Sequence, residues 1–484
     1  MNKVTLLCSS AATICLISAF SFTSKGPNHS NSKVKTKRIT LTYCKDIAPI
    51  IYSKCYSCHR PSEAAPFTLK TYEDVQQRGD FIAQVTEKRY MPPWKPAPTS
   101  VHYQGDESLT QDQIDKIQTW VKEGMVKGDE ASLPKLPQFS GTWSLGQPDL
   151  IVKMPKPFTV PADGPDVYRN FVIPLHLKKD EYLAAIDFRP SARTVVHHSL
   201  FYYDSSGYAE SIDGQDGQPG FGGLMGIEQV ALHAAGSGGA LSFMTFGSSG
   251  SPTSGSKFGN LGGWAVGAQP RILPDGLAYY LPKSSDLILS THFHPNGMKE
   301  TEQSTVGLYF AKKPPANEFT ALLLPPIFGF LSGIDIPAGD KNYQLLDSYT
   351  LPVGTNAVGV SAHAHYLGKH MQLTAILPDG KSIDLLDITD WDFNWQGQYQ
   401  FAHSINLPAG TKLNSLITYD NSATNPRQPS SPPKEVRWGE QTTDEMGSLI
   451  LVVVPKNHAD MKKLDDDYFA HVRDTYLRNV TTKR

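Results

Sequence analysis

The sequence has few cysteines and almost no net charge. Only five of its 484 residues are cysteine, and its formal net charge is −2 at pH 7. Cys8 and Cys15 lie in the leading segment, so the rest of the chain keeps Cys44, Cys55 and Cys58, too few for a disulfide scaffold. Lysine and arginine are scattered rather than gathered in a stripe. This distribution argues against a nucleic-acid partner and favours a small molecule.

Long hydrophobic runs are absent beyond the first two dozen residues. The one apolar stretch, from Val4 to Phe22, follows a lysine and is broken by serine and threonine. It predicts a secretory signal peptide at residues 1–24, with an uncleaved membrane anchor as the alternative. Residues 25–40 are polar and basic, as expected for a solvated linker. We therefore expect an exported protein, either periplasmic or extracellular.

The chain is too long for one hydrophobic core, and its pattern changes along its length. Apolar residues recur at helical spacing in 41–130, and after a proline-rich joint the chain consists of short β-rich runs separated by turns. The predicted fold class is a small all-α domain at 41–130 followed by two antiparallel, jelly-roll-like β-sandwich domains at 145–315 and 316–458. We also expect a loop in the Gly- and Ser-rich stretch 236–263 and an amphipathic helix at 459–484.

The first chemical motif is CYSCH, at residues 55–59. It is typical of covalent c-type haem attachment, in which Cys55 and Cys58 bind the haem vinyl groups and His59 is an axial iron ligand. A redox dithiol is the alternative, but no βαβ pattern surrounds the motif. The sequence therefore predicts haem c as a cofactor.

A second axial ligand is expected downstream of this motif. Met91 precedes two prolines in RYMPPWKP, so a stiff, extended segment would hold its thioether in place. His102 is the rival ligand, and simple core packing is the alternative role for Met91. Ligation by His and Met closes both iron faces and suits transfer of single electrons. A role for Cys44 does not follow from the pattern.

This part of the chain resembles the small cytochrome c domain that begins a family of exported bacterial proteins. The resemblance runs through the motifs YCKDIAPIIYSKCYSCHRPSEAAPF, TYED, MPPW and GDESLTQDQIDKIQTWVKEG. It implies a cytochrome c domain at residues 41–130.

Six of the fifteen histidines lie in three short motifs at predicted strand ends: His197-His198, His292-Phe293-His294 and His363-Ala364-His365. The two histidines of an H-x-H motif share one face of a strand and can chelate one ion. Adjacent histidines point to opposite faces, so the HH pair can share a metal only where the backbone is bent. The alternative for that pair is one buried, bonded imidazole and one in water.

Imidazole suits copper, zinc, iron or nickel. The absence of Asp and Glu within the three motifs argues against a facial-triad iron site. A thioether ligand would favour copper, because soft sulfur prefers Cu(I).

Four segments resemble, in order, the copper motifs of the type II copper monooxygenases, the family of peptidylglycine α-hydroxylating monooxygenase and dopamine β-monooxygenase. These segments are VVHHSLFYY, STHFHPNG, SAHAHYLGKHM and QTTDEMGSLILVV, and the resemblance covers most of residues 145–455. It implies two antiparallel β-sandwiches, each holding one of two copper ions across a solvent-filled cleft.

The resemblance also implies the ligands of each copper. An electron-transfer copper would bind to His197, His198 and His292. An oxygen-activating copper would bind to the catalytic set His363, His365 and Met446, in which Met446 is a weak, soft ligand. His294 has no counterpart in the family and is either a partner of a ligand or a bystander. No motif requires His370 or Met371.

The sequence departs from the family at positions that concern the substrate. Where the peptide-hydroxylating member has an arginine for the peptide carboxylate, this chain has Ser361, and the family's Asn and Tyr are replaced by Ser448 and Ile450. A glycine-extended peptide is therefore not the expected substrate, because its carboxylate would lose a charged partner. The disulfides of the family are absent as well.

The expected function is an exported copper-dependent monooxygenase that hydroxylates a C–H bond of a small organic substrate with molecular oxygen. Each turnover needs two electrons, and each copper stores one. We therefore expect the haem to be the one-electron reductant of the electron-transfer copper at His197, His198 and His292. A non-enzymatic haem and copper electron-transfer or copper-binding protein is the alternative. A third interpretation is a pair of carbohydrate-binding sandwiches beside an independent cytochrome.

Overall fold

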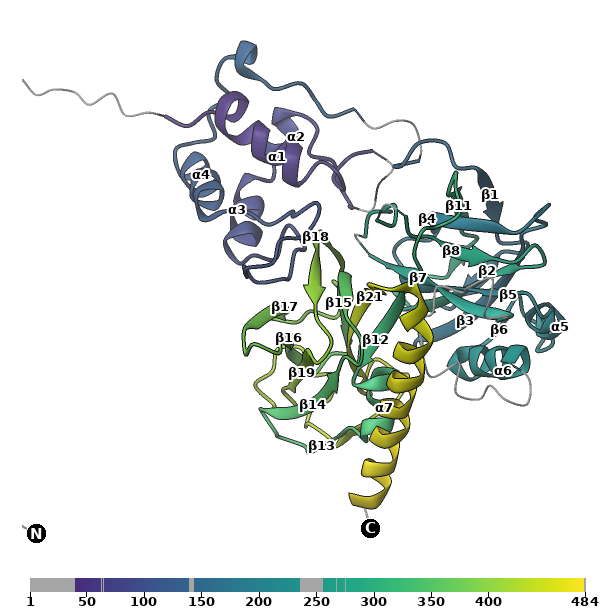
Figure 1. Ribbon diagram of the computed structural model, residues 1–484. Coiled ribbons are helices and arrows are strands. Elements are labelled where there is room, and N and C mark those ends of the chain that lie inside the picture. Colours follow the sequence, from purple (N-terminus) through teal and green to yellow (C-terminus); the bar gives the residue numbers. More distant parts are fainter. Residues whose placement is uncertain are drawn as a thin grey trace, which may run out of the picture. The chain divides into compact units, whose positions relative to one another are not determined.

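Most of the described chain is organised in β-sheets. The computed structural model describes residues 40–61, 63, 65–138, 143–235, 256–266, 268–274 and 276–482, where strands form six antiparallel sheets (Figure 1). The expected signal peptide and almost all of the expected linker lie outside the described residues. No helix in these described ranges is both long and apolar enough to span a bilayer.

Short helices precede the sheets. They are η1 (Tyr43–Ile47), α1 (Ala48–Lys54), α2 (Tyr72–Gln76), α3 (Gly79–Glu87), α4 (Gln111–Lys122) and η2 (Glu130–Ser132). Reciprocal capping boxes start α2 at Thr71 and α4 at Thr110, because each threonine accepts a backbone N–H that a helix start leaves free. The buried face of α4, with Ile114, Ile117 and Trp120, packs into an apolar cluster with the other helices.

The expected fold class, with a small all-α domain ahead of two β-sandwich domains, is wrong. Leu41–Arg484 form one unit that consists mainly of sheets, and the helices belong to it. The chain between α3 and α4 lies along the sheets: Ala97 N–H donates to the carbonyl of Asp387 (2.7 Å), and Tyr103 forms a β-bridge with Phe401. Helical spacing indicated where helices form, but not which core the proline-rich segment between them joins.

Two larger sheets share one apolar core. The first contains β1 (Leu150–Lys153), β11 (Thr305–Phe310), β4 (Glu181–Arg189) and β8 (Tyr279–Leu281), in that order. The second contains β6 (Phe221–Gly222), β3 (Val167–Pro174), β9 (Asp286–Phe293), β5 (Val196–Asp204) and β7 (Phe258–Ala265). Phe188 of β4 and Phe201 of β5 meet in the core, with ring centroids 5.5 Å apart. We call these sheets the first sheet pair.

Smaller elements extend the first sheet pair. They are β2 (Phe158–Val160), which pairs with β10 (Glu300–Glu302), and the helices α5 (Tyr208–Ile212) and α6 (Gly223–Ala235). Ile227 and Val230 of α6 bury the outer side of the five-stranded sheet at Tyr202 and Ile288. The helix therefore covers that face of the sheet at these two residues.

The expected loop at 236–263 is only partly described. Residues 236–255 lie outside the described residues, and the end of the expected loop is wrong because Phe258–Ala265 is strand β7. The glycines reflect close packing: a Cβ on Gly259 would meet the Tyr203 ring at 2.4 Å, and one on Gly263 would meet Leu200 at 2.9 Å. Glycine in this strand therefore admits large neighbouring side chains of β5.

A second sheet pair follows. One sheet contains β12 (Thr320–Leu324), β21 (Gly447–Pro455), β15 (Thr355–Ala364) and β18 (Gln398–Leu407). The other contains β14 (Tyr343–Thr350), β19 (Lys412–Tyr419), β16 (Gly368–Ile376) and β17 (Ser382–Ile388). Leu373, Ile417 and Leu451 lie in the core that they share, to which Tyr103 also belongs.

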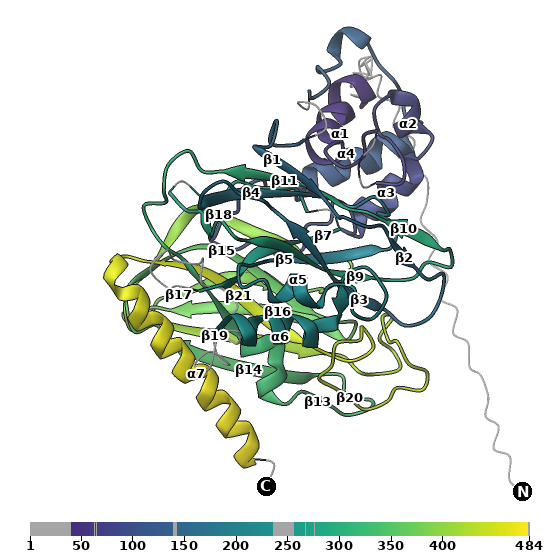
Figure 2. The same cartoon turned by 90° about the vertical axis from the view of Figure 1, so that its right-hand side faces the viewer.

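The C-terminal helix α7 (Met461–Thr482) packs on the second sheet pair (Figure 2). Leu464 and Val472 are buried, and the Tyr468 hydroxyl donates to the Leu323 carbonyl and accepts from its N–H, both at 2.8 Å. The expected helix at 459–484 is thus present. The remaining elements are η4 (Pro326–Ser332), η5 (His458–Asp460) and the short pair β13 (Asp335–Ile336) and β20 (Val436–Arg437).

Candidate metal centre

Three histidines of the first sheet pair meet at the ends of two neighbouring strands. His198 of β5 pairs directly with His292 of β9, and a register shift between Val196 and His198 bends β5. That bend satisfies the condition for adjacent histidines to share a side. The ring centroids of His197 and His198 are 5.2 Å apart, and potential ligand atoms of all three residues lie within 4.8 Å of one another. We call His197, His198 and His292 the first histidine group.

The chemistry of the first histidine group fits a bound metal ion. Burial and the neighbouring histidines lower the pKa of His197 to about 3 and that of His198 well below its usual range. Burial also lowers the pKa of His292. Nε2 of His197 and Nδ1 of His292 are buried and lack a hydrogen-bond partner in the described part of the chain. Neutral imidazoles with unsatisfied, buried nitrogens are suited to bind a metal ion.

Asp166, which the sequence did not single out, lies behind the first histidine group. Its Oδ2 is 3.1 Å from Nε2 of His292, and its Oδ1 accepts from Nδ1–H of His294 (2.7 Å). Burial favours protonation of Asp166, but close contacts with His292 and Thr442 outweigh it and hold the pKa far below its usual range. The His294 side chain is 56% exposed. His294 is thus outside the group, as a partner of the same carboxylate.

A second set of candidate ligands lies on the second sheet pair. His363 and His365 share a face of β15, with ring centroids 5.3 Å apart. Met446 comes immediately before β21, whose first residue, Gly447, pairs with Ala364. Continuing this register by one residue sets Met446 opposite His365. We call His363, His365 and Met446 the second group.

Glu445 holds two members of the second group next to each other. Its Oε2 accepts the backbone N–H of His365 (3.0 Å) and that of Met446 (3.2 Å), while Oε1 accepts the N–H of Leu367 (2.7 Å). Glu445 is completely buried, and burial raises its pKa to about 8 even though these N–H groups favour the carboxylate. The carboxyl therefore fixes the backbone on which two candidate ligands stand.

Both imidazoles of the second group are oriented through Nδ1. Nδ1–H of His363 donates to Oε1 of Gln396 (2.6 Å), and Nδ1–H of His365 donates to the carbonyl of Asp444 (3.1 Å). Burial lowers the pKa of both rings. Nε2 is therefore the nitrogen left for a metal on each ring, an arrangement common among metal-binding histidines.

The two groups lie in contact with each other. The ring centroids of His198 and His363 are 6.2 Å apart. Phe393 stacks on His197 at 4.1 Å and lies 5.7 Å from His365. The resemblance implied two sites across a solvent-filled cleft, whereas here an aromatic ring packs between the groups.

The four candidate haem residues line one cavity of about 230 Å³ together with apolar side chains. They are Cys55, Cys58, His59 and Met91. Nδ1–H of His59 donates to the carbonyl of Phe67 (3.1 Å), which leaves Nε2 free, and burial lowers the His59 pKa. Both thiols are free. Two thiols, a neutral imidazole and a thioether around an apolar cavity fit a covalently attached haem.

The competing candidates lie elsewhere. His102 is exposed and does not line this cavity, and Cys44 is fully buried among the helices. His370 bonds to Asp387 (2.7 Å), and Met371 lies in the core of the second sheet pair. None of these four residues belongs to either group of metal ligands.

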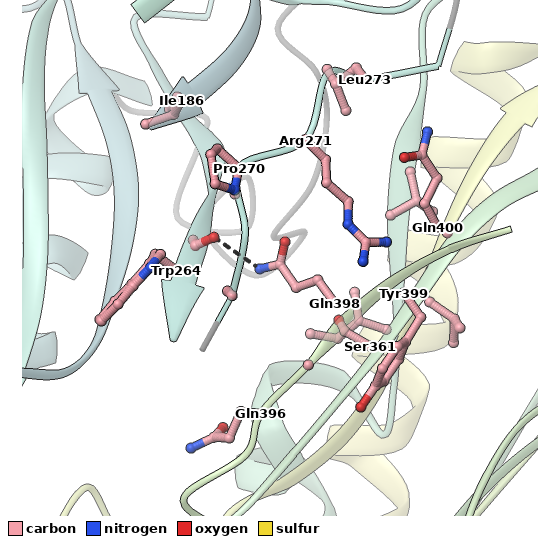
Figure 3. A pocket seen from close by; sticks show the side chains of 18 of the residues that line it. Ile186, Trp264, Pro270, Arg271, Leu273, Ser361, Gln396, Gln398, Tyr399 and Gln400 are labelled. Atoms are coloured by element: carbon pink, nitrogen blue, oxygen red, sulfur yellow. Dashed lines mark hydrogen bonds between the residues drawn. The ribbon is translucent and has the colours of Figure 1, made fainter. Parts of the chain in front are cut away.

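A second cavity, of about 330 Å³, lies between the two sheet pairs (Figure 3). Ser361, Ile450 and Gln396 line it, so it reaches the residue that bonds to His363. Nε2 of Gln398 donates across it to the Gly263 carbonyl (3.3 Å). Its volume lies in the range of small-molecule sites, roughly 300–1,000 Å³.

No protein-family model and no curated protein matches the chain. Solved structures that match include the VP2 subviral particle of infectious bursal disease virus, at 8% identity and a TM-score of 0.18 over 65% of this chain and 73% of that chain. The major capsid protein of bacteriophage PM2 matches at 10% identity and a TM-score of 0.23 over 60% of this chain and 96% of that chain. Similarity this weak carries no argument about fold or function.

Sequence reasoning missed the residues that support the ligands. Glu445 lies inside the TTDEM motif, so that motif was a usable signal. Asp166, Phe393 and Gln396 lie in segments without metal-ligand spacing, and only their contacts in the fold reveal them.

Proposed function

We propose that this chain is an exported copper-dependent monooxygenase that hydroxylates a C–H bond of a small organic molecule with molecular oxygen. The observation that carries the proposal is the contact between two unlike groups of candidate ligands. One offers three imidazoles, and the other offers two imidazoles and a methionine whose backbone N–H bonds to the same Glu445 oxygen as that of His365. Imidazole and thioether together favour copper over harder metals.

In this proposal His197, His198 and His292 hold one copper ion, and His363, His365 and Met446 hold the other. Copper bound there would supply one-electron redox chemistry and a position for oxygen. Gln396 and the Asp444 carbonyl bond to Nδ1 of His363 and His365, which would leave Nε2 of each ring to bind the metal. Phe393 packs between the two groups, and the cavity between the sheet pairs would hold the substrate.

The proposal includes a c-type haem held by Cys55, Cys58, His59 and Met91. The four side chains line one cavity, and the Phe67 carbonyl accepts from Nδ1–H of His59, which would leave Nε2 to bind the haem iron. Haem in this place would supply one-electron transfer.

The experiment is metal and haem analysis followed by an oxygen assay. We expect the exported protein to bind two copper ions and one haem, and to consume oxygen in proportion to hydroxylated product when reduced and given candidate C–H substrates. His363→Ala should remove one copper and abolish product. His370→Ala, a histidine bonded to Asp387 away from both groups, is the matched control and should retain both ions.

Two outcomes would contradict the proposal. Protein that binds both metals without substrate-coupled oxygen consumption would be an electron-transfer or copper-binding protein. Protein that binds no copper would show that the two groups of candidate ligands do not form a copper centre.

A further inference from the structure

One loop contacts both the metal centre and the cysteine-lined cavity. It joins β17 to β18 and contains residues 389–397. Phe393 of this loop stacks on His197, Trp395 lines the cavity, and Gln396 bonds to His363. Four residues of the chain, 393–396, thus contact both groups of candidate ligands and the cavity.

Trp395 lies at the cavity end of this loop. Its ring forms an edge contact with Tyr90, 6.2 Å between centroids, and both residues line the cavity of the two cysteines. Its Nε1–H is buried and has no acceptor in the described part of the chain. A buried indole N–H ordinarily finds a partner, and a carboxylate of a bound haem is an acceptor of the required kind.

Gln396 lies at the metal end. Its Nε2 donates to the carbonyl of Phe393 (3.2 Å), which fixes the amide so that Oε1 accepts from Nδ1–H of His363 (2.6 Å). The amide thus touches the imidazole ring itself. The route from Trp395 to that ring consists of covalent bonds and this one short hydrogen bond.

A competing route starts from the same cavity at Val266. Its N–H donates to the carbonyl of His197 at 3.3 Å. That bond is longer and ends on the main chain, several covalent bonds from the imidazole. Phe393 of the loop also reaches the first histidine group, but by stacking on His197 without a hydrogen bond. The short hydrogen bond from Gln396 to His363 therefore favours communication with the second group over the first.

We propose that Trp395 and Gln396 form the electron-transfer connection between the haem and the copper at the second group. This inference rests on the proposed function. Through these residues one electron passes from Fe(II), which becomes Fe(III), to Cu(II), which becomes Cu(I). No proton is transferred, and no covalent bond forms or breaks. This electron acceptor differs from the one expected from the sequence, where the haem reduces the copper of the first histidine group.

The test uses the full chain loaded with haem and copper, without oxygen or substrate. Laser-flash photoreduction by deazaflavin delivers an electron to the haem, and its reoxidation is followed in the visible haem band. Freeze-quenched EPR reports which Cu(II) signal disappears. In Gln396→Leu we expect haem reoxidation to slow by about tenfold, because the hydrogen bond to the ligand is gone.

The controls separate this role from general damage. Gln396→Glu keeps an acceptor for Nδ1–H of His363 but loses the donor to the Phe393 carbonyl, so it should restore part of the rate. Asn394→Leu changes an exposed residue of the same loop that bonds only within the loop, to Asp392, and should leave the rate unchanged.

The two levels of the proposal fail differently. Wild-type protein that binds no haem or no copper contradicts the proposed function. Wild-type protein that binds both, but whose haem reoxidation is indifferent to Gln396→Leu and depends on His198 rather than His363, contradicts the connection alone.

Discussion

The imidazoles of His198 and His363 lie 6.2 Å apart, centroid to centroid, although they belong to different sheet pairs. Metal ions bound by the two groups would therefore influence each other directly, through space and through Phe393. This closeness distinguishes the centre from two independent sites.

The first prediction concerns magnetic coupling. Protein with Cu(II) in both groups should give an EPR spectrum that is broadened by dipolar interaction. His363→Ala and His198→Ala, each left with one intact group, should give narrow spectra of isolated Cu(II). If the wild-type spectrum equals the sum of the two single-site spectra, the ions do not interact and the groups are further apart in solution.

The second prediction concerns Glu445, whose two oxygens accept three backbone N–H groups. Gln at this position keeps the size but replaces one acceptor with an NH₂ group that faces backbone donors. We expect Glu445→Gln to destabilise the fold by about 1–3 kcal/mol and to weaken copper binding at the second group alone. Urea unfolding and copper titration of each group would measure the two effects.

The matched control for this prediction is Asp444→Asn. The backbone carbonyl of Asp444 accepts from Nδ1–H of His365, while its carboxylate accepts from Gln441 N–H. Copper binding at the second group should stay close to that of the wild type. Equal loss at both groups in Glu445→Gln would mean that Glu445 supports the fold generally and not the ligands.

The third prediction concerns Asp166, which faces both His292 and His294. Asp166→Asn removes the negative charge beside a candidate ligand and should lower copper affinity at the first histidine group by about 10–100-fold. His294→Ala keeps the carboxylate and removes only the exposed partner, so it should change the affinity much less. A larger effect of His294→Ala would identify His294 as a ligand itself.

The sequence predicted elements better than it predicted their assembly. Short β-rich runs between turn residues located β5 and β9, and helical spacing located α4, since local backbone preference determines both patterns. It misjudged the segment around Tyr103, because a proline-rich stretch has no period that reveals which core it joins. His197 and His198 lie on the same side of β5 because the strand is bent there, and no residue type in the sequence predicts that bend.

The supporting side chains were harder still. Each candidate ligand lies in a motif, but Asp166, Phe393 and Gln396 reach the ligands from distant segments, and Gln396 is 33 positions from His363. Such pairs form through tertiary packing, which the local spacing of residues in the sequence does not predict. Stability and chemistry depend on them no less than on the ligands.

The last prediction concerns pH and lies away from the metal centre. Burial, together with the nearby Glu210 and Asp204, raises the pKa of Asp286 to about 6, and Asp286 pairs across strands with Asp204. The folded state therefore binds this proton more tightly than the unfolded chain does. Protonated Asp286 stabilises the fold fully below the pKa that this carboxyl has in the unfolded chain, near 4. The stabilisation is lost as the pH rises through about 6.

Asn at position 286 resembles the protonated carboxyl at every pH. Asp286→Asn should therefore be more stable than the wild type at pH 8, by about 1 kcal/mol because the carboxyl is only partly buried, and the difference should vanish at pH 4. Urea unfolding of the two metal-free proteins at each pH measures this difference, and other groups cancel in the comparison. Asp379→Asn, at an exposed turn, controls for the general effect of removing a charge. A gain that is equal at both pH values would show that the amide acts through hydrogen bonding, not through the titration of Asp286.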